Sequence, residues 1–352
     1  MRRDEEQNLV SEQQSNNVGT DDRLVALTRW VQALPSFEAA TLESASDDAS
    51  FRRYFRVRSG DQTWIAMDAP PPMEDCRPFV QVAGFLQAMA VNAPTIDAAD
   101  VERGFLLMAD FGDVTLLEAI TRDPERIETL YADAIDTLAR MQTHGAEFQG
   151  RLPPYDLALL QRELDLFRDW LCDRHLGITF SKTEDSSWQQ VCEQLIDNAL
   201  AQPRVFVHRD YHSRNLMLTE TDNPGVIDFQ DAVEGPLTYD LVSLLRDCYF
   251  RLESERLDAF ARRYYLEMRG AMTKDIGPDE FTQHLDLTGL QRHLKAAGIF
   301  ARLLHRDGKS RYMADVPTAL RYVLDVAPRY PALSPLADFI RDRCLPPLEA
   351  EA

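Results

Sequence analysis

Two neighbouring stretches of this chain carry polar side chains at a spacing that suits phosphoryl transfer. VHRDYHSRNLML (207–218) places Asp210 five residues before Asn215, and Asp228 follows Asn215 by thirteen residues in VIDFQDA (226–232). Carboxylate and amide oxygens are the hard ligands that Mg²⁺ prefers, and a further carboxylate can accept the proton of an attacking hydroxyl. We therefore predict that Asn215 and Asp228 bind the metal and that Asp210 is the catalytic base. The competing interpretation is that these are plain turn residues.

The fixed positions in these stretches resemble a known family of enzymes. HRDYHSRN (208–215) matches the protein-kinase catalytic loop H-R-D-x-x-x-x-N at every fixed position, and Ile227-Asp228-Phe229 stands where the metal-binding Asp-Phe-Gly would be. The second histidine, His212, and the later Gly235-Pro236 and Tyr239-Asp240-Leu241 make the chain similar to the aminoglycoside phosphotransferase family, the small-molecule relatives of protein kinases. This resemblance implies a protein-kinase-like fold, a kinase activity, and ATP and Mg²⁺ as cofactors.

Four longer stretches resemble one branch of that family, which phosphorylates the anomeric hydroxyl of N-acetylmuramate and N-acetylglucosamine in peptidoglycan recycling. They are residues 46–57, 208–217, 227–247 and 291–312. The resemblance therefore implies a small-molecule amino sugar as the partner. Two alternatives stay open: a kinase of the same family for choline, homoserine or an aminoglycoside, and a nucleotide-binding pseudokinase that serves as a scaffold.

The same resemblance assigns supporting roles around the catalytic loop. Asp240 would hold the loop by accepting backbone hydrogen bonds, although a simple helix N-cap explains this residue equally well. His208 and Arg209 would be structural and would pin the loop through packing and hydrogen bonds. His212 could shuttle a proton, but we favour a structural histidine with satisfied hydrogen bonds.

The expected adenine contacts come from the connection between the two lobes. In the resembling family, backbone groups of this connection bond the adenine edge. Leu107, Met108 and Ala109 are therefore the adenine-contact candidates. The letters Asp110-Phe111-Gly112 also occur here, but they precede the catalytic loop by about a hundred residues, and this order excludes them as the metal site.

The phosphate contacts depart from the kinase pattern. Kinases place a strand lysine on the phosphates of ATP, whereas the chain has Met67-Asp68 at that place and its first lysine is Lys182. Ser50, Arg52 and Arg53 offer donors nearby, and arginine is a natural bidentate partner for phosphate. We hypothesise that Arg52 or Arg53 replaces the missing lysine. The alternative is that both are solvated charges on a strand face.

The acceptor site has candidates of both charges. A cationic acceptor would favour a carboxylate cluster, which Asp231, Glu234 and Asp307 could supply. The lactyl carboxylate of N-acetylmuramate would instead favour a cation, for which Arg302 and Arg306 are the candidates. These arginines also suit the C-terminal end of a helix before Gly308, where cations interact favourably with the helix dipole.

The spacing of apolar residues predicts the elements that position these side chains. In the first part we expect a helix over 21–34, a β-hairpin around 59–61, a helix over 77–90, and strands at 95–96 and 105–109. Beyond residue 110 we expect helices at 127–141, 156–176, 187–200, 239–252, 254–269 and 288–305, and short strands at 205–207, 216–218 and 226–227.

The expected fold class is α+β, with a small N-lobe built on an antiparallel sheet and a larger, mainly helical C-lobe. The predicted division is a disordered tail at 1–20, a nucleotide-binding lobe at 21–110 and a catalytic and substrate lobe at 111–352. The tail prediction rests on a polar segment that is almost free of large apolar side chains.

Composition excludes several other classes of protein. The formal charge of −20, from 38 basic and 58 acidic residues, would repel the phosphate backbone of nucleic acids. No apolar run approaches the roughly 20 residues of a membrane span, and we find no secretory signal or anchor. The five cysteines are scattered singly and are expected to be reduced. We therefore expect a cytoplasmic protein, most simply a monomer, with no nucleic-acid or membrane partner.

Overall fold

The computed structural model describes residues 21–46, 51–272 and 275–350. The chain divides into two compact units. The first contains the described residues up to Val80 together with Pro94–Asp110, and the second contains Gln81–Ala93 and the chain from Phe111 onward. The sequence predicted a single boundary between the two lobes, at residue 110. In the structure, the contacts of residues 81–93 place this segment in the second unit as well.

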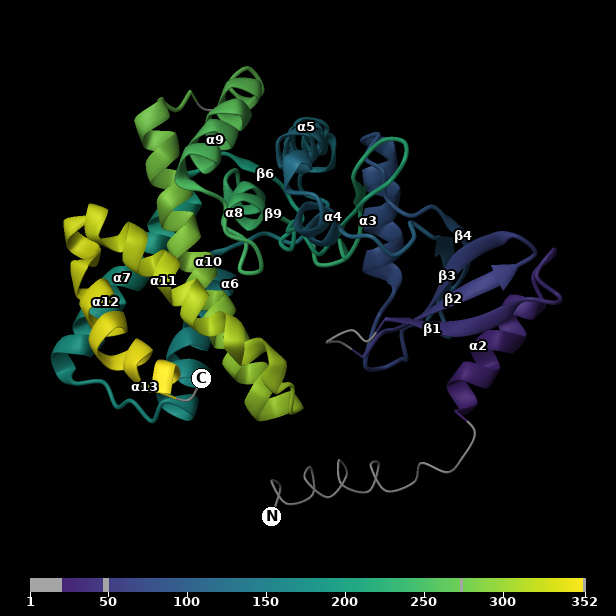
Figure 1. Ribbon diagram of the computed structural model, residues 1–352, viewed down its shortest axis with the longest axis horizontal. Helices are drawn as coiled ribbons and strands as arrows, with labels where there is room; N and C mark the ends of the chain where they lie inside the picture. Colours follow the sequence, from purple (N-terminus) through teal and green to yellow (C-terminus); the bar gives the residue numbers. More distant parts are fainter. Residues whose placement is uncertain (1–20, 47–50, 273–274, 351–352) are drawn as a thin grey trace, which may run out of the picture. The chain divides into compact units, whose positions relative to one another are not determined.

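The first unit is built on a five-stranded antiparallel sheet in the order β1-β2-β3-β5-β4 (Figure 1). The strands are β1 (Thr41–Ser46), β2 (Arg53–Ser59), β3 (Gln62–Asp68), β4 (Ile96–Asp100) and β5 (Phe105–Ala109). The hairpin predicted around Gly60 is confirmed, since Ser59 pairs with Gln62 and Gly60 has a φ of 62°, which glycine adopts readily. Strand β1 was not predicted.

Helix α2 (Asp22–Gln32) covers one face of this sheet, as its apolar spacing predicted. Asp21 caps it by accepting a hydrogen bond from the amide of Leu24 at 3.1 Å. The buried cluster between helix and sheet contains Leu27, Val31, Ala40, Phe55, Val57, Ala66, Phe105 and Leu107. Alternate residues of β2 therefore face this core, as expected for a strand with one buried side.

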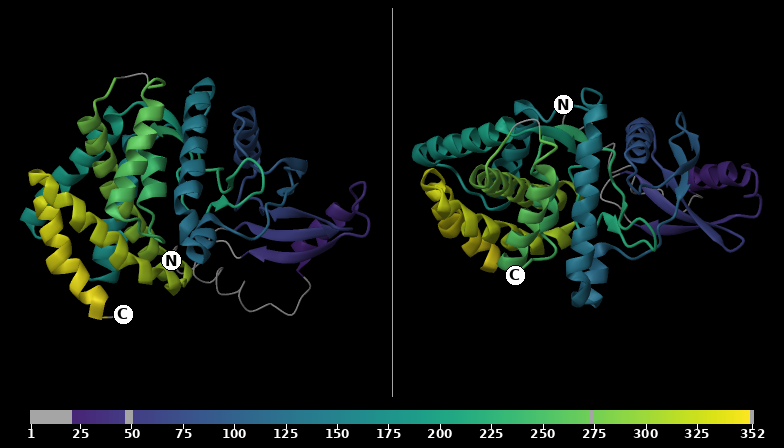
Figure 2. Two further views of the ribbon diagram at one scale, coloured as in Figure 1. Left: turned by 45° about the horizontal axis from the view of Figure 1, so that its top comes forward. Right: turned by 90° about the horizontal axis from the view of Figure 1, so that it is seen from above.

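The second unit is mainly helical, and its longest helix, α10 (Pro278–Asp307), contacts α6, α7, α8 and α11 (Figure 2). The helices other than α10 that lie wholly in this unit are α4 (Leu116–Arg122), α5 (Ile127–His144), α6 (Leu157–Leu166), α7 (Lys182–Ala201), α8 (Tyr239–Leu245), α9 (Ser254–Met268), α11 (Val316–Val326), α12 (Ser334–Phe339) and α13 (Leu345–Ala350). Helix α3 (Arg77–Ala88) begins in the first unit and ends in the second. Together the units confirm the predicted α+β class.

Two short β-pairs interrupt the helices where the chemistry was predicted. Strand β6 (Arg204–Val207) pairs with β9 (Val233–Pro236), and β7 (Leu216–Met217) pairs with β8 (Gly225–Val226). Three of these strands were predicted. Strand β9 was not predicted, because glutamate, glycine and proline have low strand propensity and the strand depends on pairing with β6.

The helix predicted over 239–252 ends at Leu245. Just beyond it, the Asp247 carboxylate accepts hydrogen bonds from the backbone amides of Ser213 at 3.0 Å and Tyr249 at 2.9 Å, and from the Ser213 hydroxyl. Because this carboxylate bonds amides of a distant loop and of its own turn, the chain leaves the helix there. The difference from the prediction thus arises from a long-range contact.

Two further features concern the described helices and the cysteines. Across residues 21–46, 51–272 and 275–350, no helix is both long and apolar enough to cross a membrane. All five cysteines carry free thiols, and burial raises the pKa of four of these thiols. The four are Cys76, Cys172, Cys192 and Cys248.

Candidate active site

The loop that follows β6 is held by a carboxylate from α8. Asp240 lies in the first turn of α8 and accepts hydrogen bonds from the backbone amides of His208 at 2.6 Å and Arg209 at 2.9 Å. Burial raises the pKa of Asp240 to about 7, although both hydrogen bonds favour the ionised form. Arg209 has a φ of 79°, which is uncommon for a residue with a side chain. These hydrogen bonds thus stabilise a strained loop conformation next to Asp210.

His208 connects the loop to the strand that precedes Asp228. Its Nδ1 accepts a hydrogen bond from the amide of Asp210 at 3.2 Å, and its Nε2 lies 3.0 Å from the carbonyl oxygen of Ile227. An amide can only donate, so Nδ1 is unprotonated and the Nε2–H donates to Ile227. Burial lowers the pKa of His208 to about 4, which keeps the ring neutral at pH 7. His208 therefore positions Asp210 and does not exchange protons with it.

Asp210 presents a half-buried carboxylate that no other described side chain engages. It forms no ion pair and accepts no hydrogen bond on its carboxylate oxygens from the described residues. Burial raises its pKa, but the nearby positive charges, Lys295 and Arg292 among them, together lower it below its usual value. An ionised carboxylate with unoccupied lone pairs can orient a hydroxyl and accept its proton.

Asn215 and Asp228 lie together at the end of the second β-pair. The Asn215 Nδ2 lies 3.0 Å from the backbone oxygen of Asp210 and 3.3 Å from Oδ2 of Asp228, and Gln230 donates to the other carboxylate oxygen at 2.9 Å. Asp228 has a φ of 62°, the second non-glycine residue of the site in the left-handed region. The backbone thus holds Asp228 in a conformation that packing and hydrogen bonds must maintain.

This pair fits a hard divalent cation. Asp228 and the amide oxygen of Asn215 offer oxygen ligands, and Mg²⁺ usually takes one or two carboxylates plus substrate phosphates and water. No group of three or more histidine, cysteine, aspartate or glutamate side chains able to hold a metal occurs in the described part of the chain. The donor set therefore suits an ion that arrives with a nucleotide better than a resident, fully protein-ligated metal.

A buried carboxylate that sequence reasoning missed, Glu163 of α6, holds the side chain of Arg209. Glu163 Oε1 lies 2.7 Å from Arg209 and 3.0 Å from Lys295 of α10. Its Oε2 accepts hydrogen bonds from Gln291 at 3.0 Å and from the Tyr155 hydroxyl. Burial raises the pKa of Glu163, but Lys295 and Arg209 outweigh burial and lower it. Glu163 is therefore the ionised centre of a network that joins the catalytic loop to two helices.

Close helix packing makes this network possible. A Cβ added at Gly298 of α10 would lie 2.5 Å from the carbonyl oxygen of Leu166, at the end of α6. Glycine at this position therefore allows α10 to approach α6 closely enough for Lys295 to reach Glu163. No short motif announces this contact, because the two residues of the ion pair lie far apart in the sequence.

The candidate phosphate-binding residues belong to the first unit. Ser50 lies outside the described residues. Arg52 is half-buried just before β2, and Arg53 within β2 donates to the fully buried carboxylate of Asp68 at 3.1 Å and pairs with Asp21. Asp68 also accepts from Arg23 at 2.9 Å. A phosphate-binding role for Arg52 or Arg53 stays a prediction. A phosphate at Arg53 would have to share the guanidinium with the carboxylates of Asp68 and Asp21.

The adenine candidates Leu107, Met108 and Ala109 form the end of β5. Strand β5 pairs with β3 on one side and β4 on the other, and the amide of Ala109 donates to the carbonyl of Thr95 at 2.9 Å. Much of this backbone is therefore engaged within the sheet. Their contact with adenine stays a prediction.

The acidic acceptor candidates lie at different depths. Glu234 in β9 accepts a hydrogen bond from the amide of Gly150 at 2.8 Å and forms an ion pair with Arg204 at 3.2 Å. Its carboxylate thus connects β9 to neighbouring segments. Asp231 is exposed, and its side chain accepts from Gln230 at 3.3 Å.

The two cationic candidates on α10 also differ from each other. Arg306 is exposed and forms an ion pair with its neighbour Asp307 at 2.7 Å. Arg302 is half-buried, and its Nε has no hydrogen-bond partner. A substrate role for either arginine stays a prediction.

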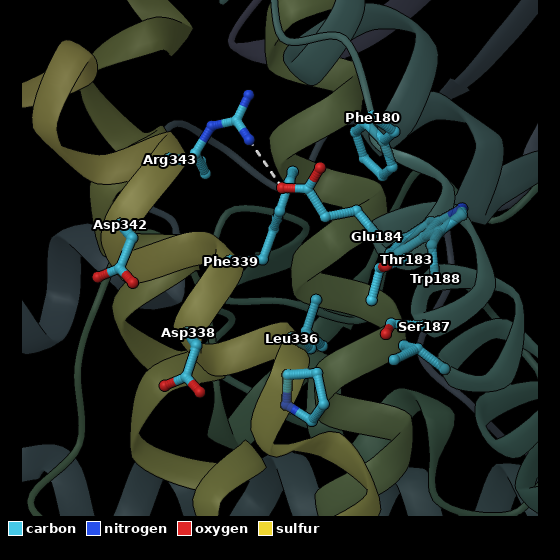
Figure 3. A pocket seen from close by; sticks show the side chains of 12 residues that line it. Phe180, Thr183, Glu184, Ser187, Trp188, Leu336, Asp338, Phe339, Asp342 and Arg343 are labelled. Atoms are coloured by element: carbon cyan, nitrogen blue, oxygen red, sulfur yellow. Dashed lines mark hydrogen bonds and ion pairs between the residues drawn. The ribbon is translucent and has the colours of Figure 1, made fainter.

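A separate cavity of about 390 Å³ lies in the second unit, between α7 and the C-terminal helices (Figure 3). Aromatic side chains of Phe180, Trp188 and Phe339 line it, together with the carboxylates of Asp338 and Asp342. None of the predicted catalytic, metal or substrate residues lines this cavity, so it is not part of the candidate active site.

Comparison with known proteins identifies similar sequences over most of the chain. Residues 41–274 match the Phosphotransferase enzyme family. An N-acetylmuramate/N-acetylglucosamine kinase of Pseudomonas putida is 44% identical over 92% of this chain and 97% of its own length. Proteins of the same name from Pseudomonas aeruginosa and Neisseria meningitidis are 47% and 40% identical over 86% and 89% of this chain, and over 88% and 94% of their own lengths.

Solved structures share the fold at low sequence identity. A choline kinase from Streptococcus pneumoniae matches 87% of this chain and all of its own with a TM-score of 0.59 at 11% identity. An ADP-bound aminoglycoside phosphotransferase matches 86% of this chain and 98% of its own with a TM-score of 0.55 at 13% identity. These likenesses confirm the predicted protein-kinase-like fold.

Proposed function

This chain belongs to the phosphotransferase enzyme family, and we propose that it is an ATP-dependent kinase that phosphorylates the anomeric hydroxyl of N-acetylmuramate and N-acetylglucosamine. The observation that carries this proposal is the set of relatives that are 40–47% identical over most of the chain and share one substrate pair in their names. We further propose that the enzyme is a monomer and that it acts in the cytoplasm on the free sugar.

The geometry supports a direct transfer from nucleotide to sugar. The sugar hydroxyl would bind Asp210, whose ionised carboxylate has no other described partner and can accept the proton as the new O–P bond forms. His208 and Asp240 keep the backbone of this loop in place through the hydrogen bonds described above. Preorganisation of this kind lowers the cost of orienting the reacting groups.

Asn215 and Asp228 are the residues that would hold Mg²⁺ in this proposal. When bound, the ion would supply positive charge that neutralises the phosphate oxygens during transfer. The chain's own contribution is to hold the Asn215 side chain beside Asp228, with Nδ2 3.3 Å from Oδ2, and to keep Asp228 in its left-handed backbone conformation.

The charges around Asp210 favour a neutral or anionic acceptor over a cationic one. Lys295, Arg292 and Arg209 lower the pKa of Asp210 by their positive charge, against the effect of burial. Lys295 and Arg209 share the Glu163 carboxylate, so Arg292 is the group from which a choline or aminoglycoside cation would meet repulsion. This observation supports the amino-sugar assignment against the alternative acceptors of the family.

The test is a substrate panel with the full chain. The protein is incubated with MgATP and N-acetylmuramate, N-acetylglucosamine, glucose, choline or kanamycin, while ADP release and phosphorus NMR are followed. We expect an anomeric phosphate signal with the first two compounds only. Turnover of choline or kanamycin in place of the sugars would refute the substrate assignment, and no turnover with any compound would favour the scaffold.

A further inference from the structure

Helix α10 presents cationic side chains toward the catalytic loop. Arg292 and Lys295 are three residues apart, and this spacing places both on one side of the helix. Both side chains contact the same aromatic ring. The guanidinium carbon of Arg292 lies 5.2 Å from the centroid of the Tyr239 ring, and the Lys295 amine lies 5.5 Å from it. The two cations are therefore neighbours.

Only one of these two cations has a counter-ion. Lys295 lies 3.0 Å from the Glu163 carboxylate and donates to the Tyr239 hydroxyl at 2.8 Å. Arg292 forms no ion pair with any described carboxylate, and its buried Nε has no hydrogen-bond partner. Removing part of a guanidinium from water without a matched anion is unfavourable. A ligand anion would supply the missing partner.

Arg292 lies close enough to Asp210 for its charge to act on the catalytic carboxylate. Contacts connect the two positions: Arg292 packs on Tyr239, Lys295 bonds both Tyr239 and Glu163, and Glu163 pairs with Arg209, the residue before Asp210. Arg292 is also among the groups that lower the pKa of Asp210 against burial. All these residues belong to the second unit, so their arrangement is internal to it.

We propose that Arg292 binds the lactyl carboxylate of N-acetylmuramate and is the residue that recognises this substituent. The inference rests on the proposed function, because it assumes that the anomeric hydroxyl binds at Asp210. The lactyl group is attached two ring carbons from that hydroxyl, so its carboxylate is close enough to the hydroxyl to reach a cation next to Asp210. N-acetylglucosamine has a neutral hydroxyl there and makes no use of the charge.

The ring of Tyr239 gives the guanidinium a defined orientation. A guanidinium stacked against an aromatic face keeps its N–H donors at the rim of the stack, where a planar carboxylate can take two of them. Such charge-assisted pairs are stronger than neutral hydrogen bonds. A flexible, solvated lysine at position 292 would retain the charge but not this geometry.

Arg292 is better placed than the two arginines singled out from the sequence. Arg306 already has the carboxylate of Asp307 at 2.7 Å. Arg302 lies ten residues beyond Arg292 on the same helix, a rise of about 15 Å. A substituent two ring carbons from a hydroxyl on Asp210 is too short to span that rise. We therefore assign the carboxylate contact to Arg292 in place of Arg302 and Arg306.

The test compares two sugars on one variant. Steady-state kinetics with MgATP are measured for the wild type, Arg292→Met and Arg292→Lys with N-acetylmuramate and N-acetylglucosamine. We expect Arg292→Met to lower kcat/KM for N-acetylmuramate by about 10- to 100-fold, mainly through KM, the range for a lost charge-assisted hydrogen bond. N-acetylglucosamine should lose at least about tenfold less kcat/KM than N-acetylmuramate, because it loses only the effect of the Arg292 charge on Asp210. Arg292→Lys keeps this charge and should be intermediate for N-acetylmuramate alone.

Two further arms separate the possible outcomes. Arg321 forms an exposed ion pair with Glu349 on a neighbouring helix. Arg321→Met removes an equally large cation and should leave kcat/KM unchanged for both sugars. The neutral lactamide of N-acetylmuramate should lose no more kcat/KM in Arg292→Met than N-acetylglucosamine does. Equal losses on both sugars, or no loss on either, would overturn this inference alone. Wild-type turnover of neither sugar would overturn the proposed function and the inference with it.

Discussion

The Glu163 network is the feature whose removal should affect the second unit most. In Glu163→Gln the side chain keeps its shape but loses its charge, so the buried cations Arg209 and Lys295 lose their shared counter-ion at 2.7 and 3.0 Å. The new amide has one oxygen and one NH2 group, so in either orientation its NH2 meets donors, Gln291 on one side or Arg209 and Lys295 on the other. The substitution therefore leaves both charge and hydrogen bonding unmatched.

The expected magnitude follows from burial. The side chain of Glu163 is 5% exposed and that of Lys295 is 11% exposed, so water can replace little of the lost interaction. Removing one partner of a buried ion pair typically costs about 3–5 kcal/mol. Glu163→Gln should lose a similar free energy of unfolding. In Glu163→Gln/Lys295→Met the net charge of the network returns to the wild-type value and only Arg209 lacks its counter-ion. The free energy lost in the double variant should therefore be smaller than the sum of the two single losses by at least about 1 kcal/mol.

The assay is urea unfolding followed by helical circular dichroism, which reports mainly on the second unit, for the wild type, both single variants and the double variant. Arg321→Met serves as a control, because its ion pair is exposed and exposed pairs contribute about 1 kcal/mol or less. The reasoning is refuted if Glu163→Gln unfolds within about 1 kcal/mol of the wild type. Strict additivity of the two single losses would equally contradict a shared network.

Two further predictions concern the loop itself. Asp210→Asn should lower kcat by about 10²–10⁴-fold with little change in the KM for ATP. The reason is that it removes a positioned proton acceptor but no described contact to other side chains. An unchanged kcat in a steady-state ADP-release assay would rule out a catalytic role for Asp210. Burial lowers the pKa of His208 from 6.5 to about 4, so the folded state binds fewer protons than the unfolded state in this range. Its contribution to stability is then complete above pH 6.5 and is lost as the pH falls toward 4, by up to about 3 kcal/mol. In His208→Asn this part of the pH dependence of stability should disappear. The prediction is wrong if the urea midpoint changes between pH 7 and pH 4.5 by the same amount in the variant and in the wild type.

The active-site loop is the part of the structure that local sequence predicted best. Residues 208–215 lie within a few positions of one another, so their spacing alone brings the main-chain contacts of Asp210, Asn215 and His208 within reach. The hairpin around Gly60 was equally readable, because a glycine with positive φ between two apolar strands is a local signal. Elements of this kind need little information from the rest of the chain.

Elements that depend on distant partners were missed or misplaced. Strand β9 has poor strand formers and exists because it pairs with β6, and the helix beginning at Tyr239 stops where Asp247 bonds a loop 34 residues earlier. The arginines proposed from the sequence show the same limit. Arg53 has a buried carboxylate beside it that its neighbours in sequence do not reveal.

By itself the sequence determined the reaction class, because the proposed proton acceptor and metal ligands are held by a short loop and two adjacent strands. Only the tertiary structure decided which charges surround them. Glu163 reaches Arg209 across 46 residues, and Arg292 approaches Asp210 from α10. The physical reason is that local hydrogen bonds depend on spacing along the chain, whereas buried charges depend on which helices pack together.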